Sequence, residues 1–122
     1  MHVYSFEKLD VWKEAIQLAV STYQTTGALP SAEKFGLISQ MRRASVSVSS
    51  NIAEGTARST YKDKAKFITI SYSSALELLN QLIISKNLEF IDEEQYAKLW
   101  LEIESITNKL NALRNHYLKT TT

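Results

Sequence analysis

The sequence contains no cysteine, one proline and only three glycines among its 122 residues. Without cysteine the chain can form neither disulfides nor thiolate metal sites, and it suits a reducing compartment, so we expect a cytoplasmic location. A β-sandwich or β-barrel needs a turn every ~8–12 residues, and these few turn-forming residues do not support one. No apolar run approaches the ~20 residues of a membrane span, so we expect no contact with a membrane.

The remaining composition is that of a globular protein, with 44% hydrophobic and 22% charged residues. The length suits a single domain over residues 1–122. Apolar residues recur at spacings of three and four in four stretches, which predicts helices over roughly residues 6–25, 31–56, 61–88 and 92–118. Because the connections are short, neighbouring helices must be antiparallel. The sequence therefore predicts an all-α fold, an antiparallel up-down-up-down four-helix bundle.

Local signals refine this prediction. Asp92 and Gln95 have the spacing of a capping box ahead of the last helix, and Thr60 with Asp63 resembles one ahead of the third. Gly27 is expected to end the first helix in the left-handed conformation. The residues expected to face the core are Leu9, Trp12, Ile16, Ala19 and Tyr23 in the first helix, Leu37, Met41, Ala44, Val48 and Ile52 in the second, and Tyr96, Leu99, Ile103, Ile106, Leu110, Leu113 and Tyr117 in the fourth.

A polar stripe runs along the second helix beside its apolar face. Small residues flank the stripe and allow another backbone to approach, so we expect it to be buried against another helix of the same or a neighbouring chain. A buried Arg43 needs a carboxylate partner, and Glu77 of the third helix is the best candidate. The resulting network would fix the register of the helices; the alternative is a small-molecule or nucleic-acid site around Arg43 and Glu77. The polar stripe and its expected partner comprise Gln40, Arg43, Ser47, Asn51, Glu54 and Glu77.

Catalytic patterns are missing from the sequence. His2 and His116 are the only histidines, and neither follows a glutamate by three residues as a di-iron bundle requires. The serines between positions 45 and 50 lie in no nucleophile elbow. We therefore expect no enzymatic activity, no cofactor and no metal.

Charge is unevenly distributed, although the formal net charge is only +1. Residues 34–66 contain seven basic and two acidic side chains, whereas six acids accompany one lysine between positions 87 and 108. In an up-down-up-down bundle the turn between the second and third helices lies at the same end as both termini. Lysine clusters bind nucleic-acid phosphates, and a solvated surface is the alternative. We call this cluster the basic end; it comprises Arg58, Lys62, Lys64, Lys66, Arg114 and Lys119.

The run Gln-Met-Arg-Arg-Ala-Ser-Val-Ser at positions 40–47, followed by Asn-Ile-Ala-Glu-Gly at 51–55 and by Arg58, resembles the motif of a bacterial family. Its members are called four helix bundle proteins or 23S rRNA-intervening sequence proteins. The segments 6–12 and 75–77 are also similar to the family, whereas Tyr72 stands where it often has glycine. The resemblance implies four antiparallel helices, a homo-oligomer such as the pentameric rings of relatives, and no established enzymatic activity or cofactor. A related accessory protein of diversity-generating retroelements binds nucleic acid and a reverse transcriptase through a strongly basic surface.

Three functions therefore remain open. The first is a small oligomeric bundle that binds RNA or another nucleic acid through the basic end. The second is a self-assembling scaffold or adaptor that recognises only protein. A small-molecule pocket between helices, around Arg43 and Glu77, is a more remote third.

Overall fold

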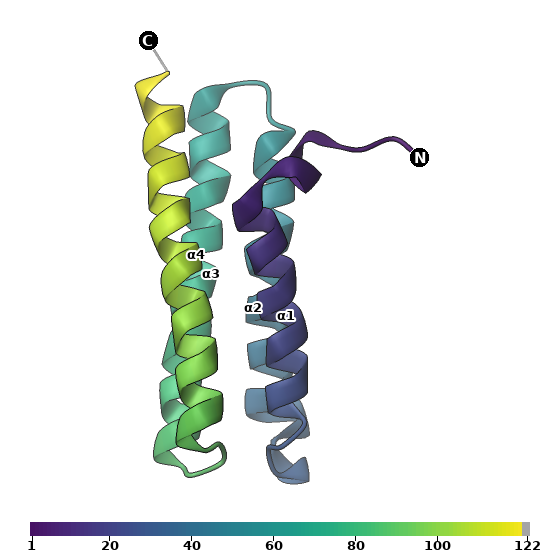
Figure 1. Cartoon of the computed structure of the whole chain (residues 1–122), viewed down its shortest axis with the longest axis vertical. Coiled ribbons are helices and arrows are strands. Elements are labelled where there is room, and N and C mark those ends of the chain that lie inside the picture. Colours follow the sequence, from purple (N-terminus) through teal and green to yellow (C-terminus); the bar gives the residue numbers. More distant parts are fainter. Residues whose placement is uncertain (121–122) are drawn as a thin grey trace.

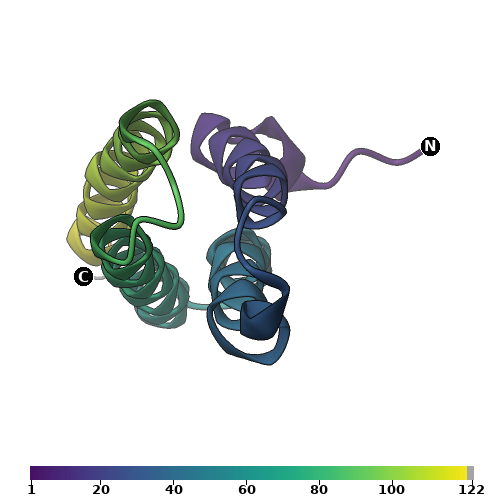
Figure 2. The ribbon, with the colours of Figure 1, turned by 90° about the horizontal axis from the view of Figure 1, so that it is seen from below.

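Four long helices account for most of the chain in the computed structural model, which describes residues 1–120. They are α1 (Asp10–Thr26), α2 (Ser39–Thr56), α3 (Tyr61–Asn87) and α4 (Glu93–Lys119). The helices run alternately up and down along one axis (Figure 1). Each packs against two neighbours in the order α1, α2, α3, α4 and back to α1 (Figure 2). No strand occurs in the described residues, and the predicted all-α, antiparallel four-helix bundle is confirmed.

The helix ends follow the sequence signals in α3 and α4 but not in α1. The Asp92 carboxylate accepts a hydrogen bond from the backbone N–H of Gln95 at 2.8 Å, and the backbone N–H of Asp92 donates to Oε1 of Gln95 at 3.0 Å. The expectation of a left-handed Gly27 is wrong, because its φ is −61° and the following amides continue in tight right-handed turns. The left-handed residue is Glu89 instead, with φ 63°, in the turn between α3 and α4.

The chain enters α2 through irregular turns. A 3₁₀ turn, η2 (Ser31–Glu33), and a π turn, η3 (Lys34–Ile38), precede the regular helix, which begins only at Ser39. Gly36 has φ −110° and ψ −114°, far from helical values, and the Glu33 carboxylate accepts the Leu37 amide at 3.3 Å. The helix expected from residue 31 is therefore interrupted, and Phe35 is left 88% exposed. A similar turn, η1 (Ser5–Lys8), precedes α1.

The core contains the expected faces of α2 and α4 but a different face of α1. Met41, Val48 and Ile52 of α2 are fully buried, as are Leu99, Ile106 and Leu110 of α4. The residues of α1 that point inward are Val11, Ala15, Leu18 and Thr22, whereas the expected Ile16 and Tyr23 are 39% and 47% exposed.

Threonine explains this difference. In α1 the Thr22 hydroxyl donates to the Leu18 carbonyl at 2.7 Å, and the Thr26 hydroxyl donates to the Thr22 carbonyl at 2.8 Å. A hydroxyl that bonds to its own helix can be buried without a partner on another helix. The core face of α1 is therefore the one that includes these threonines. Of the expected face, Leu9 and Trp12 pack partly against the core, whereas Ile16 and Tyr23 point outward.

Helices α2 and α3 approach closely at Gly55. A Cβ atom at this position would lie 3.0 Å from Cβ of Phe67 and 3.3 Å from the carbonyl oxygen of Lys64. Further along the same seam, the Ser71 hydroxyl donates to the carbonyl of Val48 at 2.7 Å. Small side chains thus allow the two backbones to lie near each other.

Helix α3 is the most apolar of the long helices by mean hydropathy over a membrane-length window. Its 27 residues include an 18-residue window of mean hydropathy 1.3, so by length and composition alone it could cross a bilayer. The apolar residues of α3 are interspersed with serines and do not form one continuous run, and the expectation of no membrane contact stays a prediction. In the bundle α3 packs against α2 and α4, and nine of its residues are buried.

Candidate nucleic-acid interface

The basic end is where α2 passes into α3 and where α4 terminates (Figure 1). Three of its cations line one open groove between α3 and α4: Lys62 and Lys66 come from the first two turns of α3, and Arg114 from the last part of α4. The groove has a volume of about 460 Å³, and Asp63 is its single carboxylate. Three cations against one acid leave the groove positively charged.

Arg114 is the most constrained of the three cations. Its side chain is half-buried, and its Nε atom is buried without a hydrogen-bond partner among residues 1–120. Burying an N–H without a partner costs roughly 1–3 kcal/mol. Because the Nε atom is buried, an oxyanion in the groove can reach only the exposed part of the Arg114 side chain.

Two members of the basic end have structural roles. The Nζ atom of Lys64 donates to the carbonyl of Thr56 at 2.6 Å and lies 6.0 Å from the centre of the Tyr117 ring. A cation at the first turn of α3 is mildly unfavourable for that helix, but here it stabilises the carboxyl end of α2. The guanidinium of Arg58 lies 4.2 Å from the centre of the Phe67 ring. Phosphate binding by these two residues would therefore compete with contacts inside the chain.

Two further residues near the end of α4, Tyr117 and Lys119, add no negative charge to the basic end. Burial raises the pKa of Tyr117, and the neighbouring Tyr61 adds to the rise, so the phenol is neutral at physiological pH. Lys119 is exposed in the last turn of α4, where a cation is favourable. The residues of the basic end that are available to an anion are thus Lys62, Lys66, Arg114 and Lys119.

The polar stripe of α2 forms a network only in its middle. Ser47 and Ser74 share a hydrogen bond of 2.8 Å that joins α2 to α3. The Asn51 amide donates to the hydroxyl and the carbonyl of Ser47 at 3.0 and 2.9 Å. Gln40, Arg43 and Glu54 are exposed, as is Glu77 on α3. Within one chain the stripe is therefore half-buried at its centre and open to solvent at both ends.

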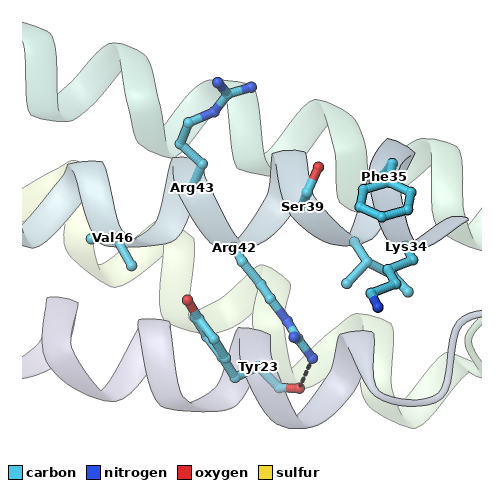
Figure 3. A pocket seen from close by; sticks show the side chains of 8 residues that line it. Tyr23, Lys34, Phe35, Ser39, Arg42, Arg43 and Val46 are labelled. Atoms are coloured by element: carbon cyan, nitrogen blue, oxygen red, sulfur yellow. Dashed lines mark hydrogen bonds between the residues drawn. The ribbon is translucent and has the colours of Figure 1, made fainter.

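The expected ion pair between Arg43 and Glu77 does not form within the chain. The two ion pairs among residues 1–120 are Lys86 with Glu93 and Lys109 with Glu14. Gln81 donates to the Glu77 carboxylate at 3.3 Å, and Arg43 extends into solvent on the side of α2 away from α1 (Figure 3). An exposed guanidinium is solvated by water and needs no carboxylate, so burial of Arg43 inside the chain was a wrong expectation. Burial against a neighbouring chain stays a prediction.

A third polar cluster, between α1 and α4, was not anticipated. Glu14 accepts a hydrogen bond from Ser105 at 2.6 Å and pairs with Lys109, while Ser21 donates to Glu102 at 3.1 Å. Polar residues spaced three or four apart at positions 14, 17 and 21 and at 102, 105 and 109 were the available signal. The cluster ties the two helices together along the seam they share.

The pKa values of the two carboxylates in this cluster are shifted in opposite directions. Burial alone would raise the pKa of Glu14, but the bonds from Lys109 and Ser105 outweigh it and leave that pKa below its ordinary value. Burial raises the pKa of Glu102 against the opposing effects of Ser21 and Lys98, and its Oε2 atom has no hydrogen-bond partner in the described residues. No group of three or more metal-ligating side chains occurs in residues 1–120.

Comparison with known proteins agrees with the fold and the motif. The family model of the 23S rRNA-intervening sequence proteins matches residues 7–112. A crystal structure of a protein of unknown function from the S23 ribosomal protein family of Bacteroides thetaiotaomicron is similar, with a TM-score of 0.77 and 21% identity over 85% of this chain and 97% of that chain. None of the curated proteins compared is similar to the sequence. Because the family model spans the whole bundle apart from its ends, the chain belongs to the family of 23S rRNA-intervening sequence proteins.

Proposed function

We propose that this protein binds RNA or another nucleic acid through the backbone phosphates, at the groove between α3 and α4. The observation that carries the proposal is the convergence of Lys62, Lys66 and Arg114 on one groove that contains a single carboxylate. Phosphate contacts from lysine and arginine give affinity that depends on salt but not on sequence. A groove with three cations would bind a single strand weakly and without base specificity.

The test compares two variants that lose the same charge. In the first, Lys62, Lys66 and Arg114 are all replaced by glutamine. The control replaces the exposed Lys8, Lys13 and Lys98, which lie outside the groove. Binding of a fluorescent single-stranded RNA is measured by anisotropy between about 50 and 200 mM salt, a range over which phosphate contacts weaken strongly.

The groove variant should bind more weakly than the control and should show a smaller dependence of log Kd on log salt concentration. Each lost phosphate contact removes about 0.7 from that slope for a single strand, so the full effect is about 2. If RNA binding weakens equally in the two variants, the general surface charge and not the groove is responsible for binding. No binding by the unaltered protein at about 50 mM salt would remove the proposal.

A second candidate is self-assembly into a homo-oligomer that serves as a scaffold, with the pentamer of related proteins as the expected form. Exposed aliphatic side chains support it: Ile70, Leu76 and Ile84 on α3 are 40%, 44% and 40% exposed, and Glu77 is the only charged residue from Phe67 to Ser85. An apolar surface of this kind is typical of protein contacts. Light scattering tests it, because a scaffold must have a mass that is a multiple of 13.9 kDa.

The two candidates are compatible. An oligomer would repeat the basic groove in each subunit, and several weak phosphate contacts on one strand would act together. A scaffold that recognises only protein would assemble normally and leave the RNA free. Measuring the mass with and without RNA separates the two.

A further inference from the structure

The outward face of α1 continues into a groove with basic edges. Ile16, Val20 and Tyr23 lie on that face at helical spacing and are 39%, 44% and 47% exposed. Where α1 meets the start of α2, a groove of about 530 Å³ lies beside Tyr23, and Phe35 and Val46 also line it (Figure 3). We call it the Phe35 groove. A phenylalanine as exposed as Phe35 is unusual on a surface that contacts only water.

Every charged residue of the Phe35 groove is basic. Lys34 lies with its Nζ atom 5.5 Å from the centre of the Phe35 ring, and Arg42 and Arg43 complete the charged lining. Arg42 is held in place, since its Nε atom donates to the hydroxyl of Thr26 at 2.9 Å and its Nη2 atom to the carbonyl of Tyr23 at 3.3 Å (Figure 3). This side of the bundle therefore presents apolar surface with a positive rim.

The seam between α3 and α4 has the opposite charge. Trp100 lies between two hollows of about 390 and 250 Å³, which we call the Trp100 grooves. Their apolar lining includes Leu76 and Leu101, which are 44% and 60% exposed. The charged residues that line them are Glu93 and Glu104. Glu93 is paired with Lys86 at 2.9 Å, whereas Glu104 forms no ion pair in residues 1–120. Glu104 therefore gives this apolar surface a negative charge that matches the positive rim of the Phe35 groove.

The fold places these two surfaces on opposite sides of the bundle at the same end. The helix pair α1–α2 and the helix pair α3–α4 form the two halves of the bundle viewed along its axis (Figure 2). The Phe35 groove lies where α1 passes into α2, and the larger Trp100 groove lies where α4 begins, and both connections are at the end away from the termini (Figure 1). Two copies standing side by side and parallel would bring the matching surfaces to the same height.

We propose that the Phe35 groove of one copy docks on the Trp100 grooves of the next copy, with the Phe35 ring against Trp100 and Leu101 and with the basic rim of the groove near Glu104. This inference rests on the self-assembly proposed above and names the surfaces that perform it. The two contacting surfaces differ, so the contact is heterologous and each copy keeps one free surface for a further copy. Such a contact closes into a ring or extends as a filament, according to the rotation between copies.

The test uses two variants that each remove one surface. Phe35→Asp removes the ring and weakens the positive rim, and Leu101→Asp places a carboxylate inside the opposing groove. Both side chains are mostly exposed, so the bundle itself should fold normally, as circular dichroism and thermal unfolding will show. The matched control is Leu118→Asp, a half-exposed leucine of α4 at the basic end.

Light scattering should give the unaltered protein and the control the same mass, a multiple of 13.9 kDa, and each of the two variants the mass of one chain. When the two variants are mixed in equal amounts, a species of two chains should appear. Leu101→Asp keeps an intact Phe35 groove and Phe35→Asp keeps intact Trp100 grooves, so one contact can still form between them. A mixture that stays at one chain would overturn the heterologous contact.

Two further outcomes separate this inference from its premise. If the unaltered protein has the mass of one chain, self-assembly fails and the inference fails with it, and the two surfaces then belong to a different partner. If the unaltered protein assembles and Phe35→Asp assembles equally well, self-assembly stands and the docking surfaces proposed here are wrong.

Discussion

Replacing Gly55 by alanine measures how tightly α2 and α3 are packed, because two effects of opposite sign meet there. Alanine is about 1 kcal/mol better than glycine inside a helix. The new methyl group, however, would lie 3.0 Å from Cβ of Phe67 and 3.3 Å from the carbonyl oxygen of Lys64. Both atoms are fixed by the α3 backbone and cannot rotate away. Overpacking of this kind costs about 1–3 kcal/mol. We therefore expect a net loss of about 1 kcal/mol in the free energy of unfolding.

Urea unfolding followed by circular dichroism tests this value. With a denaturant dependence of about 1.5 kcal/mol per molar, the midpoint should fall by roughly 0.7 M. Gly27→Ala is the control, because Gly27 has a right-handed φ of −61° and is exposed. It removes the same freedom from the unfolded chain and should be neutral or slightly stabilising. If Gly55→Ala stabilises the protein as much as the control does, the close approach of the two helices does not limit the packing.

Two other substitutions test local features. The raised pKa of Glu102 means that its contribution to stability is present below the ordinary glutamate pKa of about 4.3 and is lost as the pH rises through the higher folded value. Glu102→Gln should remove that loss, so unfolding midpoints of the two proteins measured from pH 4 to 7 should diverge with rising pH; parallel curves would contradict the raised pKa. Glu89 has φ 63°, which costs a residue with a side chain about 1 kcal/mol, and Glu89→Gly should raise the unfolding temperature by several degrees. An unchanged or lower temperature would show that other contacts of Glu89 compensate for the strain.

The parts of the fold that the sequence predicts are those where one helix face is clearly more apolar than the others. In α4 the residues from Leu99 to Leu110 at spacings of three and four are buried, and no second face competes. In α1 two faces compete. The outward face has Ile16 and Tyr23, whereas the core face has Thr22 among its members, and only the structure shows that this hydroxyl is bonded within its own helix. A pattern of side-chain types contains no information on that bond.

The basic end was predictable as a cluster but not as a site. The order of the helices brings Lys62, Lys66 and Arg114 to one end of the bundle, and the structure brings them to one groove. The sequence could not separate these residues from Lys64, whose partner is a backbone carbonyl of α2. For Arg43 the sequence suggested burial, because the residue lies beside an apolar helix face. In the structure its long side chain reaches water from that position.

The threonine hydroxyls of α1 have a consequence for how this helix is oriented. Because Thr22 and Thr26 bond within α1, little of its hydrogen bonding would change if the helix turned about its own axis or slid along it. Directional contacts from outside must then select one orientation, and they come from Arg42 at the carboxyl end and from Glu102 and Lys109 along the side. We expect the contacts of these three side chains to determine which apolar face of α1 points inward. Without them the bundle should still be helical but should no longer have a single packing arrangement.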